Sequence, residues 1–183
     1  MPRRPVIQIP HPRASPTLRR ALCAVRREFA AAGLDDLLDW VRVEQVEVPP
    51  TADAMGWYYF DRHTIRVPEW TPRAMRACAR TTGGKHISLR SVLRHEFGHA
   101  LFDYLRLDRD RAFHRRFGHG DCITAYAATN PEEDFAETFM RWMTWGGKLR
   151  RERPSPALRT KWRFVARCVR RMRAADVVRR RAA

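Results

Sequence analysis

The sequence predicts an α+β fold in which a small, twisted, mostly antiparallel sheet packs on a central helix. Alternating apolar and polar residues over 41–48, and a hairpin pattern over 57–67, are typical of strands. Apolar residues at three- and four-residue intervals between Val92 and Leu105 are typical of a buried helix. The chain has 183 residues, enough for one domain with a substantial core. We therefore assign residues 17–183 to a single domain.

The elements before the central helix follow from simple local signals. Residues 1–16 are rich in proline and arginine and are predicted to be a disordered basic tail. A basic helix follows, and then the strand region. Residues 57–60 and 63–67 form the predicted hairpin across Asp61 and Arg62, with prolines at 49, 50 and 68 marking the breaks. An edge strand here could hold an extended peptide through main-chain hydrogen bonds.

The most informative motif is His-Glu-x-x-His at residues 95–99, within the helical stretch. Residues four apart lie on one face of a helix, so His95 and His99 can bind the same Zn²⁺ ion. Glu96 lies just off that face, where a carboxylate can act as general base on a water molecule. Because a catalytic zinc site uses three protein ligands, the motif predicts a zinc hydrolase site that needs one more ligand.

Several side chains are candidates for the third ligand. Asp103 lies one turn beyond His99, but residues 101–105 contain no glycine or proline that would break the helix and bring its carboxylate back. We interpret Asp103 as a carboxylate that supports the site without touching the metal, or that is purely structural. His114, His119 and Asp121 follow in a polar, glycine-containing segment and remain alternatives.

A second helix is predicted to begin with Asn130 as N-cap and Pro131 at the first helical position. The acidic residues that follow can be explained by the helix N-terminus alone, which favours negative charge. Glu133 and Glu137, however, lie four apart on one face. One can bind the metal while the other holds a ligating histidine through its second ring nitrogen. This pair is the best source of the third ligand.

Two segments together carry a family resemblance: Arg-His-Glu-Phe-Gly-His at 94–99, and Ala-Tyr-Ala-Ala-Thr-Asn-Pro-Glu-Glu-Asp-Phe-Ala-Glu-Thr-Phe at 125–139. Over residues 90–146 the chain resembles bacterial zinc-binding metallopeptidases of the gluzincin type and, more distantly, the catalytic domain of anthrax lethal factor. The resemblance implies a zincin-like fold with one Zn²⁺ per chain, held by His95, His99 and Glu133. It also implies that Glu96 is the general base and that Tyr126 donates its hydroxyl to the developing oxyanion.

The activity that this resemblance implies is zinc-dependent hydrolysis of a peptide bond in a peptide or protein substrate. Tyr126 stands seven residues before Glu133, as in the family, although its own neighbourhood alone would favour a core aromatic. The chain has Glu132 where family examples carry an aromatic residue, and Phe135 and Phe139 where tryptophan is frequent. These differences lie beside the expected ligands and leave substrate preference open.

Positive charge is concentrated at the two ends of the chain. Residues 1–33 carry seven arginines against one acidic residue, and residues 148–183 carry fourteen basic against two acidic residues, whereas residues 34–147 have a net charge of −2. Residues 157–181 are predicted to form a basic helix with an apolar stripe. Such a surface could bind nucleic acid or an acidic partner. The alternative to a peptidase is therefore a zinc-containing binding module that does not cut.

Cysteine usage and hydropathy indicate the compartment. The four cysteines are scattered without a Cys-x-x-Cys pair, so the pattern favours a reducing environment over a disulfide framework. The first residues lack the apolar run of a secretory signal, and no stretch has the length and hydropathy of a membrane span. We expect a cytoplasmic protein without membrane contact. Nothing in the sequence indicates an oligomeric state.

Overall fold

The computed structural model describes residues 15–47, 55–71, 73, 88–150 and 154–182, with side chains up to residue 174 in the last range. Most of the predicted N-terminal tail lies outside these residues. Helices and one small sheet follow each other along the chain: α1 (Pro16–Ala32), α2 (Asp35–Trp40), β1 (Arg42–Val46), β2 (Trp57–Tyr59), β3 (Thr64–Pro68), α4 (Leu89–Tyr104), η1 (Leu107–Arg109), α5 (Arg111–His114), η2 (Tyr126–Ala128), α6 (Pro131–Thr144) and α7 (Pro156–Ala182). The α+β class is confirmed.

The sheet is mixed, so the prediction of a mostly antiparallel sheet was wrong. The strand order is β1-β3-β2. β2 and β3 form the predicted antiparallel hairpin, in which Tyr59 is paired with Thr64, whereas β1 pairs with β3 in parallel, in the register Arg42 to Thr64. The chain leaves β1, forms β2 at the opposite edge, and returns as β3 between them. Because β3 lies between the other two strands, β2 remains an edge strand.

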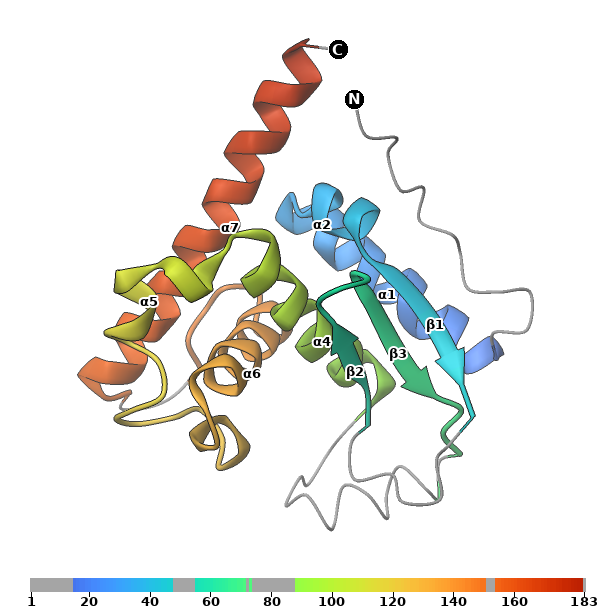
Figure 1. Cartoon of the computed structure of the whole chain (residues 1–183), viewed down its shortest axis with the longest axis horizontal. Coiled ribbons are helices and arrows are strands. Elements are labelled where there is room, and N and C mark those ends of the chain that lie inside the picture. The colour runs from blue at the N-terminus through green and yellow to red at the C-terminus, as the bar shows by residue number, and fades with distance from the viewer. Residues whose placement is uncertain (1–14, 48–54, 72, 74–87, 151–153, 183) are drawn as a thin grey trace.

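Helix α4 lies at the centre of the molecule (Figure 1). In that view the sheet and α1 lie on one side of α4, and α5, α6 and α7 lie on the other side. The contact between α4 and α6 is unusually close at Gly98, where a Cβ atom would stand 2.8 Å from the Cα atom of Ala136. A glycine inside a helix costs about 1 kcal/mol relative to alanine, so its presence here fits a close helix crossing.

The core extends from the first helix to the last. Phenylalanines dominate it, with Phe29 packed against Phe97 and Phe139, and Phe135 packed against Phe117 and Phe164. The predicted apolar stripe of the C-terminal helix is buried in this core, apart from the half-buried Ala166: Leu158, Trp162, Val165, Val169 and Met172. Helix α7 is therefore an integral part of the fold, and its basic character lies on the outward face.

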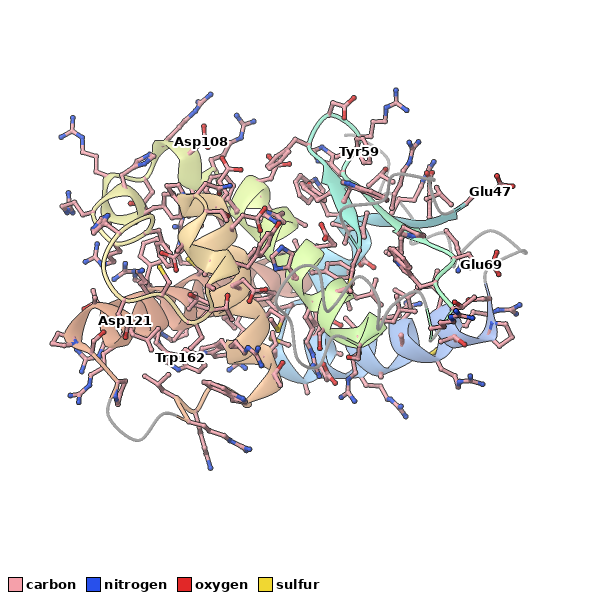
Figure 2. All side chains as sticks on the ribbon, turned by 90° about the horizontal axis from the view of Figure 1, so that it is seen from below. Glu47, Tyr59, Glu69, Asp108, Asp121 and Trp162 are labelled. Atoms are coloured by element: carbon pink, nitrogen blue, oxygen red, sulfur yellow. The ribbon has the colours of Figure 1, made fainter. Side chains whose placement is uncertain are left out.

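Side chains of the two halves of the molecule can be located in Figure 2. Asp108, Asp121 and Trp162 lie in the half built from α5 to α7, whereas Tyr59, Glu47 and Glu69 lie in the sheet half. In the described part of the chain, no helix has an apolar stretch long enough to cross a membrane.

Candidate metal centre

Three side chains from α4 and α6 converge on one point. The Nε2 atoms of His95 and His99 lie 3.2 Å apart, and the Oε2 atom of Glu133 lies 3.0 Å from the first and 3.4 Å from the second. The two histidines lie on one face of α4, as predicted from their spacing. Asn130 caps α6 by accepting a hydrogen bond from the Glu133 backbone N–H at 2.9 Å, which fixes the turn that carries the glutamate.

This group has the donor set and spacing of a metal site. For ligands about 2.0–2.1 Å from a tetrahedral zinc, adjacent ligand atoms lie about 3.3 Å apart, close to the observed separations. Among the described side chains, Glu133 Oε2 is one of few buried polar atoms without a hydrogen-bond partner. A cation between the three atoms would satisfy this oxygen and both nitrogens together. Within the described ranges, this is the one cluster of three such ligands that could hold a metal ion.

Glu137 fixes the orientation of His95. Its Oε1 atom lies 2.9 Å from Nδ1 of His95, so Nδ1–H donates to the carboxylate and the Nε2 lone pair faces the cluster. The Oε2 atom accepts the hydroxyl of Thr124 at 2.8 Å, and Thr124 Oγ1 in turn accepts the backbone N–H of Ala127 at 3.1 Å. This chain of hydrogen bonds ties η2 to the ligand helix α4.

Electrostatics make the cluster favourable for positive charge. Burial lowers the pKa of His95, but the nearby carboxylates of Glu133 and Glu137 outweigh burial and raise the pKa to about 10. Burial acts to raise the pKa of Glu133, but the nearby imidazoles of His95 and His99 outweigh it and hold that pKa well below its usual range. Both shifts have one origin, because two carboxylates face the imidazoles in a partly dehydrated site.

Glu96 is buried next to the cluster and faces the start of the edge strand. Burial raises its pKa, while the charges of His95 and His99 lower it. A Cβ atom on Gly56 would stand 3.1 Å from Glu96 Oε1 and 2.9 Å from Val92. A glycine at this position, directly before β2, therefore leaves room for the Glu96 carboxylate beneath the sheet edge.

Tyr126 is the first residue of η2 and lies next to the cluster. Its ring centroid is 5.8 Å from that of His95, and the residue is 45% exposed, which makes it accessible to a ligand. Burial of the hydroxyl, the charge of Glu133 and a hydrogen bond to that carboxylate raise the pKa of Tyr126. The hydroxyl therefore stays protonated at neutral pH and is a hydrogen-bond donor beside the cluster of His95, His99 and Glu133.

The remaining predicted residues lie away from the cluster. Asp103 accepts a hydrogen bond from the Tyr58 hydroxyl at 2.8 Å and lies 3.3 Å from Nδ1 of His63. Asp103 therefore joins α4 to the hairpin. Of the two roles predicted for it, support of the site or a purely structural role, the structure shows the structural one. His114 and His119 bond to backbone carbonyls of nearby residues, at 2.7 and 3.1 Å. Neither histidine, nor Asp121, belongs to the metal-ligand cluster.

Three residues of the site were missed by sequence reasoning: Thr124, Gly56 and Gly98. No spacing rule connects Thr124 to Glu137, and Gly56 is set against Glu96 by the packing of the sheet on α4. Gly98 did carry a signal, because an isolated glycine inside an apolar helical pattern indicates close packing.

Comparison of the chain with models of known protein families gives no match, and no curated protein matches it either. The class of this site therefore rests on its own geometry: two imidazoles and one carboxylate arranged for a metal ion, with a buried carboxylate and a tyrosine hydroxyl next to them.

Proposed function

We propose that this protein is a zinc-dependent peptidase with a zincin-like catalytic core. The observation that carries the proposal is the convergence of His95 Nε2, His99 Nε2 and Glu133 Oε2 within 3.4 Å of one another. Two nitrogen ligands and one carboxylate oxygen are a common catalytic zinc set, which leaves a fourth position for water or substrate. Zinc, when bound, supplies Lewis acidity that polarises a substrate carbonyl and makes water easier to deprotonate.

Glu96 is the proposed general base. Its carboxylate is buried beside the cluster, and burial raises its pKa towards the range in which a carboxylate both accepts and releases a proton. In the proposed reaction Glu96 takes a proton from the attacking water and delivers it to the leaving amine. A purely structural metal site needs no such residue, so Glu96 favours catalysis over a structural metal.

Tyr126 is the proposed oxyanion donor. Its hydroxyl is protonated and lies beside Glu133, and the exposed ring lies next to that of His95. A donor held in place before the reaction stabilises charge that develops on the carbonyl oxygen. The chain of hydrogen bonds from His95 through Glu137 and Thr124 to Ala127 holds this segment in position.

The substrate is proposed to be an extended peptide. β2 is an edge strand, and it begins directly after Gly56, which lies against Glu96. Among the described residues, one side of β2 has no strand partner, and its backbone groups can bind a peptide by strand addition. A peptide bound there would place a carbonyl group near the metal cluster.

Two substitutions test the proposal on the full-length protein. His95→Ala is expected to abolish stoichiometric zinc, measured by elemental analysis after dialysis, whereas the matched change of the exposed His119 to alanine leaves zinc unchanged. Glu96→Gln is expected to keep zinc and to lower cleavage of a peptide library by a factor of about 10²–10⁴. The exposed Glu132→Gln is the control for loss of one carboxylate. Unchanged zinc in His95→Ala would refute the metal site, and unchanged turnover in Glu96→Gln would refute the mechanism.

A further inference from the structure

The outward face of α7 carries a dense group of arginines. Of the α7 residues whose side chains are described, nine are exposed, and six of these are arginine. None of the nine is acidic, and none is a large apolar residue. On a helix with 3.6 residues per turn, the exposed arginines all fall within one half of the circumference. They are Arg159, Arg163, Arg167, Arg170, Arg171 and Arg173.

Two of the six are engaged with the protein backbone, and four are not. Arg159 donates to the carbonyl of Pro154, and Arg173 donates to the carbonyl of Ala32. For the remaining four, the described part of the chain provides no salt bridge to a carboxylate: Arg163, Arg167, Arg170 and Arg171, which we call the α7 arginine face. Surface arginines elsewhere in the molecule do pair with acids, for example Arg62 with Asp61 and Arg109 with Asp108.

Positive charge continues from the α7 arginine face to the neighbouring segment after α5. The guanidinium groups of Arg167 and Arg116 lie 4.9 and 5.9 Å from the centre of the same ring, Phe164. Asp110, which caps α5 by accepting two backbone N–H groups through one carboxylate oxygen, brings a single negative charge to this region and does not balance Arg116 and the α7 arginine face. Positive charges that outnumber the negative ones repel each other, and a bound polyanion would relieve that repulsion.

We infer that the α7 arginine face binds the phosphate backbone of double-stranded nucleic acid without sequence preference. The four arginines span about 12 Å of helix axis, and a duplex presents one negative charge per about 1.7 Å of its own axis. Guanidinium groups form two parallel hydrogen bonds to a phosphate. The exposed α7 positions offer no asparagine or glutamine that would read an adenine edge. Arginine can pair with a guanine edge as well as with a phosphate, and we take phosphate as the target because the duplex presents phosphates at every position.

Other polyanions fit this surface less well. Single strands are bound by stacking bases on exposed aromatic rings, but the exposed large apolar residues of the described chain are Tyr59, Phe60 and Tyr126. None lies on α7, and Tyr59 lies in the opposite half of the molecule from Trp162 (Figure 2). Phe164 itself is buried. A helix that docks firmly on an anionic membrane uses large apolar side chains in addition to charge, and the described exposed positions of α7 have none.

The test compares two quadruple variants of the full-length protein that lose equal charge. One changes the α7 arginine face to glutamine: Arg163→Gln, Arg167→Gln, Arg170→Gln and Arg171→Gln. The control changes four exposed arginines of α1 and the hairpin turn: Arg20→Gln, Arg26→Gln, Arg27→Gln and Arg62→Gln. Truncation of α7 is unsuitable because its other face is part of the core. Binding to a labelled 24-base-pair DNA duplex is measured by fluorescence anisotropy over a series of salt concentrations.

Near 0.1 M salt, the α7 glutamine variant is expected to bind the duplex roughly 100-fold more weakly than the unchanged protein. The slope of log affinity against log salt concentration should become less steep by about 3–4, because each lost phosphate contact reduces it by about 0.9. The control should weaken binding by less than about fivefold. A variant with lysine at the same four positions keeps the charge and should keep the slope. Equal weakening in both glutamine variants would show attraction by net charge alone. Equal or tighter binding of a 24-nucleotide single strand, or of polyglutamate, would also overturn the inference.

Discussion

Lys161 and Asp134 form a fully buried ion pair that joins α7 to the helix carrying Glu133. The Nζ and Oδ2 atoms are 2.7 Å apart, and both side chains are 0% exposed. Lys161 also donates to the backbone carbonyl of Asp121, and Asp134 also accepts the backbone N–H of Gly118. Lys161→Met keeps the length of the side chain and removes its charge, so it isolates the role of this pair.

We expect Lys161→Met to lower the free energy of unfolding by about 3–5 kcal/mol, because it leaves an unpaired carboxylate in the core. The other oxygen of Asp134 already has no hydrogen-bond partner among the described residues, and the remaining backbone donor, Gly118, carries no charge that could replace that of Lys161. For a chain of this length, 1 kcal/mol corresponds to about 2–4 °C in melting temperature, which gives a decrease of roughly 6–20 °C.

Urea denaturation and calorimetry of three variants test this reasoning. Lys148→Met changes an exposed lysine in the same way and is expected to shift stability by about 0.5 kcal/mol or less. The double variant Lys161→Met with Asp134→Asn keeps an acceptor for Gly118 and removes the isolated charge, so it should recover at least half of the loss. A loss below about 1 kcal/mol in the single variant, or a double variant no better than the single one, would refute a dominant role for the buried charge.

Three further substitutions probe the proposed catalytic centre. Glu137→Gln weakens the hydrogen bond that orients His95, and zinc affinity in a chelator competition should fall by about 10–100-fold; an unchanged affinity would contradict the role of Glu137. Tyr126→Phe should keep zinc and reduce kcat by about 10²–10³, with little change in KM; a change in KM alone would assign Tyr126 to substrate binding instead. Gly98→Val places a Cβ atom 2.8 Å from the Cα atom of Ala136, so the melting temperature should fall by several degrees and zinc should be lost. An unchanged melting temperature would show that α4 and α6 can move apart to accept the side chain.

Helical periodicity, capping and turn rules were sufficient to predict features that depend on residues close together in the sequence. The spacing of His95 and His99, the Asn130 cap and the apolar stripe of the C-terminal helix were all predicted, because each depends on helical periodicity or capping alone. The hairpin was predicted for the same reason, since its two strands are joined by a short turn. The structure places all of these as the sequence indicated.

The errors concern contacts between distant elements. Alternation of side chains predicts that residues near 41–48 form a strand, but it does not determine which edge of the hairpin that strand joins, so the parallel pairing of β1 with β3 was missed. Packing also decided between the two roles predicted for Asp103, because the hairpin covers that end of α4 and Asp103 accepts a hydrogen bond from Tyr58. Lys161 was not recognised as a core residue, since a buried lysine needs a partner that only packing supplies.

The sequence alone determined that two histidines and a glutamate share one helix, that a second helix begins with an acidic turn, and that charge is concentrated at the chain ends. The tertiary structure decided that Glu133 meets both histidines while Glu137 holds one of them, because Gly98 lets α4 and α6 approach closely. It also decided that one face of α7 is core and the other is an exposed arginine surface. Helical periodicity can be predicted from neighbours along the chain, whereas the distance between two helices depends on side chains from the whole core.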